Sequence, residues 1–242
     1  MTDAGRTALE GLLDKAPPLS DLVAERILAS ILGGQMKPGE RIVELSLARK
    51  LGVSRGPLRE ALKTLHAAQV VQGRKGESMR VAEPSPEQLL QMLMVRATLE
   101  GLAARLVAAT RTDESLRPLA ALHEAARQAA GAGRTEEWRE LDWRFHEAVC
   151  RAAGNDYLFA SWRTIGNLVR LFLRYHPGFE QPGGSVLANH ARLMQVLREG
   201  TPEAAEALFR GSILGSGYTR LGLPVPPHLR DVIVVSMTEP AP

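Results

Sequence analysis

The sequence has one cysteine, few aromatic residues and no hydrophobic run of membrane-spanning length. A single cysteine, Cys150, excludes an internal disulfide and a zinc site built from several cysteines. Apolar runs such as Val232 to Val235 are far too short to cross a bilayer, and the chain does not open with the pattern of a signal peptide. We therefore expect a cytoplasmic protein in a reducing compartment, with no membrane partner.

Aromatic residues make up only 5% of the 242 residues, whereas alanine and leucine are abundant. This balance favours helices over sheets. The hydrophobic content of 45% suits a globular protein with a sizeable core, and a charged content of 24% argues against disorder. The length allows one large domain or two modest ones.

Charge is distributed unevenly along the chain. Residues 18–82 carry 11 basic and 6 acidic side chains, a net charge of +5, so the rest of a chain of net charge +3 is slightly acidic. A basic N-terminal third indicates a polyanion as partner, although solvated basic surfaces are also common.

The basic third predicts three helices and a hairpin after a loose N-terminal tail over 1–17. One helix begins near Ser20, and a short one ends at Gly52. A third begins behind Ser54, a favourable N-cap, with Pro57 in its first turn. Apolar segments on both sides of 73–76 indicate a small β-hairpin. Two short helices joined by a glycine-containing turn are typical of a helix-turn-helix.

The third helix has two distinct faces. Leu58, Leu62 and Leu65 are spaced to face a core, and three basic side chains follow the opposite side: Arg55, Arg59 and Lys63. A basic stripe near a helix N-terminus can enter the major groove of DNA, where arginine reads guanine. The hairpin tip, Arg74 and Lys75, would act as a wing that contacts phosphate or the minor groove. An ordinary solvated basic face is the alternative.

The remainder of the chain predicts an all-helical antiparallel bundle. After a linker at 83–86 the pattern stays helical over 87–220, with short breaks, and residues 221–242 are assigned to a C-terminal tail. The predicted helices are 87–109, 113–131, 135–153, 156–175, 185–199 and 202–216. The fold class is therefore mainly α, with an N-terminal winged helix-turn-helix over 18–82 followed by the bundle.

Ionisable residues interrupt the apolar faces of several bundle helices. Asp142 and His146 lie one turn apart on an apolar stripe, and His190 and Arg96 sit among apolar neighbours. Such groups are costly in a core unless they are paired, hydrated or bound to a ligand, so they indicate a polar cavity. Each also has a simpler explanation, such as an ion pair between Arg96 and Glu100 one turn away.

The N-terminal segments carry a family resemblance. Lys37-Pro38-Gly39-Glu40-Arg41, Leu51-Gly52-Val53-Ser54-Arg55 and Pro57-Leu58-Arg59-Glu60-Ala61-Leu62 resemble the GntR family of bacterial transcription regulators. The resemblance implies that Ser54, Arg55 and Arg59 face DNA. Gly56 stands where threonine is usual, and Leu45 where some relatives have arginine. The predicted DNA-binding set is Arg49, Ser54, Arg55, Gly56, Arg59, Lys63, Arg74 and Lys75.

The bundle resembles the FCD effector domain of the FadR branch of that family. The matching segments are 95–100, 142–146 and Asn189-His190. Many members hold a divalent metal with one aspartate and three histidines, beside an arginine that pairs with an organic acid. By that pattern Asp142, His146 and His190 match three ligands of a Zn²⁺ or Ni²⁺ ion, Ser212 stands where the family has histidine, and Arg96 anchors a carboxylate. These five residues form the predicted effector site.

The sequence thus predicts a homodimeric transcription regulator that binds a palindromic site on double-stranded DNA and responds to a small carboxylate metabolite. The family resemblance implies a repressor, although the sequence itself does not determine the direction of control. One alternative is a DNA-binding dimer that ignores effectors. The other is a metal-assisted hydrolase using Asp142, His146 and His190. No phosphate loop, nucleophile motif or obvious general base supports an enzyme, so the prediction is that the chain is not one.

Overall fold

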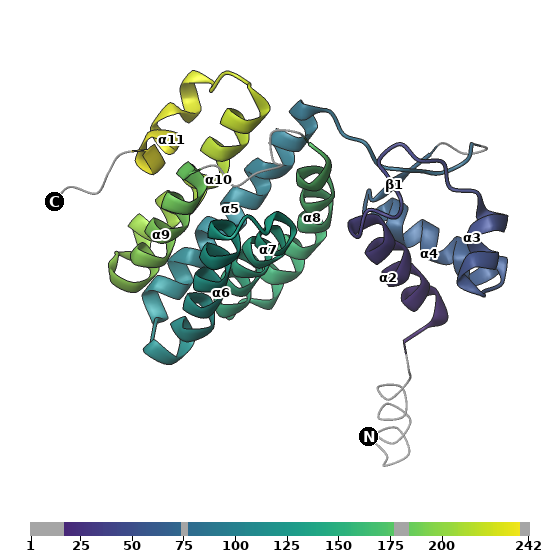
Figure 1. The fold of residues 1–242 in the computed structure, drawn as a ribbon, viewed down its shortest axis with the longest axis horizontal. Helices are drawn as coiled ribbons and strands as arrows, with labels where there is room; N and C mark the ends of the chain where they lie inside the picture. Colours follow the sequence, from purple (N-terminus) through teal and green to yellow (C-terminus); the bar gives the residue numbers. More distant parts are fainter. Residues whose placement is uncertain (1–16, 74–76, 177–183, 238–242) are drawn as a thin grey trace, which may run out of the picture. The chain divides into compact units, whose positions relative to one another are not determined.

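The computed structural model describes residues 17–73, 77–176 and 184–237. The chain forms two compact units that divide between Glu83 and Pro84. Each unit has its own core, and Figure 1 shows the elements of each. The predicted tail over 1–17 falls almost wholly outside the described residues, as does the hairpin tip with Arg74 and Lys75.

The N-terminal unit is a three-helix core with a small sheet (Figure 1). Its helices are α2 (Leu19–Leu32), α3 (Glu44–Leu51) and α4 (Arg55–Ala67). Helix α2 packs against α4, and the apolar residues that lie between the helices are almost fully buried: Ile27, Ile31, Leu58 and Leu62. The leucine face predicted for the third helix is therefore the face that packs inward.

A tight turn joins α3 to α4. Gly52 adopts a left-handed conformation with φ of 68° at the C-terminus of α3, where a side chain would strain the backbone. Ser54 follows as the N-cap of α4, yet its side chain makes no capping hydrogen bond. Because this turn is only three residues long, α4 begins close to the end of α3, as a helix-turn-helix requires.

A two-stranded antiparallel sheet completes this unit. Strand β1 (Val71–Gln72) pairs with β2 (Arg80–Val81) in the register Val71 to Val81. Arg41 forms an isolated bridge to Arg80, and the Arg80 guanidinium donates a 3.0 Å hydrogen bond to the carbonyl of Gly39. The wing is therefore tied to the segment between α2 and α3.

The C-terminal unit is a helical bundle. Its elements are α5 (Pro86–Thr110), α6 (Asp113–Gly131), α7 (Thr135–Ala152), α8 (Asp156–Tyr175), α9 (Gly184–Glu199), α10 (Pro202–Leu221), the 3₁₀ turn η2 (Pro227–Leu229) and α11 (Arg230–Met237). Figure 1 shows α5 running through the middle of this unit, and it packs against α7, α8, α9 and α10. Glycines allow close packing, because a Cβ atom on Gly101 would lie 2.4 Å from the Arg210 side chain of α10.

The sequence-based fold class is confirmed: the chain is mainly α, with a winged helix-turn-helix and an all-helical bundle. Several boundaries differ, and α10 ends at Leu221 where the sequence predicted 216. Helix α5 begins at Pro86, within the predicted linker, because Ser85 and Gln88 form a capping box around that start.

Residues 221–242, assigned to a tail, contain the 3₁₀ turn and α11. Helix α11 packs against α10 and buries Ile233, which gives this segment an apolar anchor. Among the described residues no helix combines the length and the apolar character needed to cross a membrane.

Candidate nucleic-acid interface and candidate ligand site

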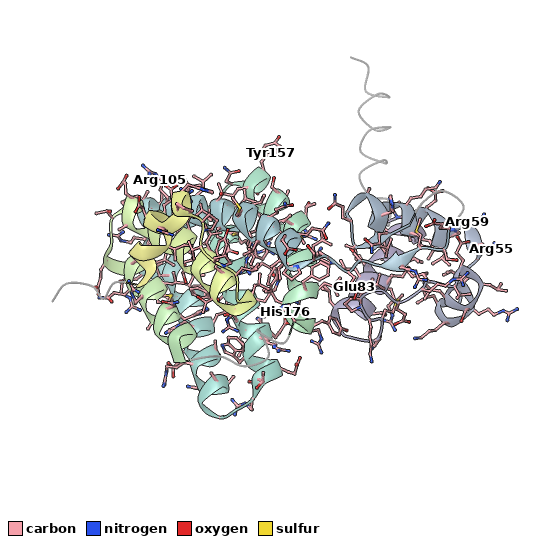
Figure 2. All side chains as sticks on the ribbon, turned by 90° about the horizontal axis from the view of Figure 1, so that it is seen from above. Arg55, Arg59, Glu83, Arg105, Tyr157 and His176 are labelled. Atoms are coloured by element: carbon pink, nitrogen blue, oxygen red, sulfur yellow. The ribbon has the colours of Figure 1, made fainter. Side chains whose placement is uncertain are left out.

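The outer face of α4 carries the basic residues that the sequence assigned to DNA. The side chains of Arg55, Arg59 and Lys63 are 60%, 55% and 68% exposed. Figure 2 shows Arg55 and Arg59 side by side at the surface of the N-terminal unit. Neither arginine is buried against its own subunit, so both are accessible to a partner.

Other predicted contact residues lie on the same motif. Arg49 on α3, together with Ser54 and Gly56 at the start of α4, is exposed. A Cβ atom added to Gly56 would have nothing within 4 Å, so the threonine usual in this family would fit there. The Ser54 hydroxyl makes no cap bond and is available for a phosphate. The two remaining residues of the predicted set, Arg74 and Lys75, lie outside the described residues.

An acidic side chain that the sequence did not single out lies among these arginines. Glu44, the first residue of α3, accepts a 2.8 Å hydrogen bond from Nε of Arg59 through Oε2. The same oxygen lies 3.7 Å from Nη2 of Arg55. One carboxylate therefore bridges α3 to both arginines of α4.

Buried polar side chains of the described residues are concentrated in the bundle. Five polar or charged residues are buried there: Arg96, Glu100, His146, His190 and Ser212. Four of them belong to the predicted effector site, and the fifth is the glutamate one turn from Arg96. The remaining predicted residue, Asp142, is partly exposed. Buried polar groups need hydrogen-bonding partners, so this cluster of buried polar side chains indicates a specific polar site in an otherwise apolar bundle.

Glu100 connects three helices. Its carboxylate accepts hydrogen bonds of 2.5 Å from Nε of Arg96 and 2.7 Å from Nε1 of Trp162, and its Oε2 lies 2.5 Å from Nδ1 of His146. Burial alone would raise the pKa of Glu100, but the charges of Arg96 and His146 outweigh it and hold the pKa well below its ordinary value. The carboxylate is therefore ionised and can only accept.

A second pair lies beside this one. Nε2 of His190 on α9 lies 2.8 Å from Oδ1 of Asp142 on α7. Burial would raise the pKa of Asp142, and the charge and hydrogen bond of His190 reverse that effect and lower it. Asp142, His146 and His190 each offer a ligand atom within 4.8 Å of the others, which is the spacing of a metal site.

The donor set fits a divalent cation. His146 uses Nδ1 toward Glu100, which leaves Nε2 as its ligand atom. His190 has a buried Nδ1 without a hydrogen-bond partner among the described residues. One carboxylate and two imidazoles suit Zn²⁺ or Ni²⁺ and leave open positions for water or a ligand. Ser212 is buried on α10, which packs against α9.

Sequence analysis missed two residues at this site. His123 on α6 stacks on His190 with ring centroids 6.4 Å apart, and burial lowers its pKa. Its spacing from Leu116, Leu119 and Ala126 on the buried face of α6 was a usable signal. Burial also lowers the pKa of Arg220 on α10, and the charge of Asp142 opposes that shift. No local pattern in the sequence indicates Arg220.

Two family models match the chain, one in each unit. The model of the FCD domain matches residues 91–213, and the model described as "Bacterial regulatory proteins, gntR family" matches residues 19–81. Together these segments contain the described residues of both candidate sites except Arg220.

Two curated relatives are similar over most of their length. The probable D-xylose utilization operon transcriptional repressor of Paenarthrobacter nicotinovorans is 29% identical over 184 residues, covering 76% of this chain and 80% of the relative. The Glc operon transcriptional activator of Escherichia coli K12 is 28% identical over 224 residues, covering 83% and 88%. One of these relatives is named as a probable repressor and the other as an activator, so the names do not agree on the direction of control.

Solved structures of the same type share the fold. A GntR transcriptional regulator from Rhodococcus sp. RHA1 matches with a TM-score of 0.71 and 22% identity, covering 85% of this chain and 99% of that one. McbR/YncC of E. coli matches with a TM-score of 0.68 and 23% identity, covering 86% and 98%. At these identities the likeness concerns the fold alone.

Proposed function

The chain belongs to the GntR family of bacterial regulatory proteins and carries an FCD domain, and from this premise we propose that it is a metabolite-responsive repressor. In this proposal a homodimer binds a palindromic operator, and a small organic acid in the bundle releases it. The resemblance inferred from the sequence is confirmed at the level of the family. The family and the relatives are transcription regulators, so the chain is a DNA-binding regulator and the hydrolase alternative is set aside.

The basic face of α4 supports the assignment of base readout to Arg55 and Arg59. Both guanidiniums are more than half exposed on a helix whose opposite face is packed into the core. A guanidinium can donate two parallel hydrogen bonds to guanine in the major groove. Arg49, Ser54 and Lys63 are assigned to the phosphate backbone, where hydroxyls and amines position the helix.

The observation that carries the effector proposal is the burial of Arg96 beside Glu100, whose carboxylate also contacts His146. Arg96 is 4% exposed and donates to Glu100 through Nε. Its Nη atoms form the other edge of the guanidinium, and that edge suits a bidentate contact with a carboxylate. The Arg96 guanidinium also lies 5.0 Å from the ring centroid of Trp143, which supports its plane. An anionic acid is therefore the ligand class that this site favours.

Asp142, His146 and His190 are the residues that would hold a divalent ion in this proposal. Such an ion supplies a Lewis-acid centre that attracts the carboxylate and carbonyl oxygens of an organic acid. Arg220, whose pKa responds to the charge of Asp142, adds a further cation near this group. The protein's own contribution is to hold the ligand atoms in place and to bury the acid away from water.

Dimerisation is supported by an exposed apolar face on α5. Met94, Val95 and Leu102 are 39%, 50% and 40% exposed on one side of this helix. Tyr157 of α8 is 89% exposed and projects from the bundle in Figure 2. A palindromic operator requires two copies of the reading helix, and exposed apolar side chains on helices are typical of a self-complementary interface.

The test uses duplexes enriched by the full chain from a random-sequence pool. Gel shifts with an enriched duplex are then titrated with a panel of small mono-, di- and hydroxy-acids, with and without added Zn²⁺ or Ni²⁺. We expect a symmetric enriched sequence and release by one class of acid. Release by none of them, with specific binding intact, would support the alternative of an effector-independent dimer.

A further inference from the structure

The bridge between Glu44 and the two arginines of α4 has a consequence for DNA recognition. Glu44 contacts Nε of Arg59 at 2.8 Å, so the side of the guanidinium that points back toward α3 is occupied. The Nη1–Nη2 edge remains as the free donor pair. The Glu44 side chain is also less exposed than the arginines that it contacts, at 35% against 55% for Arg59 and 60% for Arg55. The carboxylate therefore lies behind the guanidiniums.

A carboxylate in this place has two physical effects. It removes rotational freedom from the Arg59 side chain, which otherwise loses that entropy when it binds DNA. It also places a negative charge next to the arginines, which weakens their attraction to any phosphate. A fixed orientation of Arg59 favours binding to a base edge that fits this orientation. The negative charge of Glu44, in contrast, weakens binding to every DNA sequence alike.

We propose that Glu44 is a positioning residue that sets the discrimination between operator and other DNA. It holds Arg59 for end-on contact with a guanine edge and limits its use as a phosphate-binding cation. This inference rests on the proposed function, because it concerns the same basic face of α4. It assigns to α3 a part in specificity through a residue that itself need not touch DNA.

The chain offers a matched control on α4. Glu60 pairs with Lys63 at 2.8 Å, and both side chains are well exposed. The variants Glu44→Gln and Glu60→Gln remove the same charge from the same unit, but only Glu44→Gln weakens the contact that holds Arg59. Glu44→Asp keeps the charge and shortens the side chain. Thermal unfolding of each variant shows that the fold is retained.

The experiment compares the affinity of the full chain for an enriched duplex with its affinity for a shuffled duplex over a range of salt. For Glu44→Gln we expect binding to the shuffled duplex to strengthen, with a salt slope steeper by about one unit. The ratio of the two affinities should fall about ten-fold, a typical size for one bidentate base contact. Glu60→Gln should leave the ratio unchanged, and Glu44→Asp should lower it without strengthening binding to the shuffled duplex.

A double-mutant cycle separates positioning from simple charge. In an Arg59→Ala background, Glu44→Gln should no longer change the ratio, because the residue that it positions is absent. The inference is overturned if Glu44→Gln alone leaves the affinity ratio unchanged. It is also overturned if the ratio falls equally with Glu60→Gln, or if Glu44→Gln lowers it equally in the Arg59→Ala background. If the wild-type chain enriches no sequence at all, the proposed function fails. If the wild type discriminates between the duplexes and the Glu44→Gln variant discriminates equally well, only the inference about Glu44 fails.

Discussion

Glu100 on α5 and His146 on α7 lie 2.5 Å apart, measured from Oε2 to Nδ1. Because the low pKa of Glu100 keeps its carboxylate ionised, Nδ1 of His146 must carry the proton that is shared. A neutral His146 therefore has its lone pair on Nε2, directed to the other side of the ring. A residue outside the predicted ligand set thus determines which atom of His146 can bind a ligand.

Glu100→Gln should destabilise the bundle. Three donors, from Arg96, His146 and Trp162, converge on a fully buried carboxylate, and a neutral amide offers them one oxygen in place of two. Breaking a buried ion pair from one side costs about 3–5 kcal/mol. Urea unfolding at pH 7 measures the change in free energy.

The matched control is Glu147→Gln on α7. Glu147 pairs with Arg151 at 3.1 Å, with side chains 33% and 66% exposed, and such a pair contributes under about 1 kcal/mol. A Glu100→Gln protein as stable as the Glu147→Gln protein would show that the three contacts to Glu100 do not stabilise the fold.

Arg59→Ala and Arg74→Ala should affect DNA binding differently. Arg59 is assigned to a base edge, so its loss should remove preference for the enriched duplex while the protein stays folded. Arg74, at the predicted wing tip, is assigned to phosphate, so its loss should weaken binding on all sequences and flatten the salt slope by about one unit. Gel shifts at several salt concentrations distinguish them. Uniform weakening by Arg59→Ala would contradict base readout.

Ser212→His should tighten metal binding. An added imidazole would complete a set of four protein ligands with Asp142, His146 and His190, and should lower the dissociation constant by at least about ten-fold. Calorimetric titration with Zn²⁺ or Ni²⁺ measures it, and Ser212→Ala serves as the control that adds no ligand. Equal metal content of the two variants and the wild type after dialysis would show that position 212 does not supply the missing ligand.

Leu102→Glu should break the proposed dimer. The side chain is 40% exposed on the apolar face of α5, so a charge there costs the monomer little but would be buried and unpaired in a dimer. Sedimentation measures the mass, and Ala121→Glu on the exposed side of α6 provides the comparison. A dimer of unchanged stability would exclude this face as the interface.

Cys150 should be inert in the folded protein. The thiol is fully buried, and burial together with the charge of Glu100 raises its pKa, so almost no reactive thiolate forms. Labelling with a thiol reagent at pH 8 should be negligible before unfolding and stoichiometric in urea. Full labelling of the native protein would mean that the bundle opens around α7.

Much of the fold could be predicted from local sequence signals. The periodic apolar positions of the bundle and the glycine-containing breaks between helices predict α6 as 113–131 and α8 as 156–175, the bounds that the structure has. The opposed faces of α4 also follow from spacing, because three leucines on one side leave Arg55 and Arg59 on the other. Helix α11 was missed because nearby prolines and its short length give a weak periodic signal.

The candidate ligand site could be predicted only in part. Arg96, Asp142 and His190 stand out because each interrupts an apolar stripe on its own helix. The bonds that join Glu100 to His146 and Trp162 cross 46 and 62 residues of sequence, and no local period encodes them. The role of Glu44 was hidden for a similar reason, because its partner lies on the next helix. Pairing between helices depends on their packing, which a single sequence does not contain.

The stacked indoles beside the ligand site give the protein an intrinsic optical reporter. The ring centroids of Trp143 and Trp162 lie 4.9 Å apart. The Arg96 guanidinium lies over the Trp143 ring, and Nε1 of Trp162 donates a hydrogen bond to Glu100. A molecule that changes the electric field around Arg96 should shift or quench their emission. The remaining tryptophan, Trp138, packs in a separate cluster with Ala126 and Ala129 and supplies a steady background. Unlabelled acids can therefore be screened by fluorescence alone, before any operator has been identified.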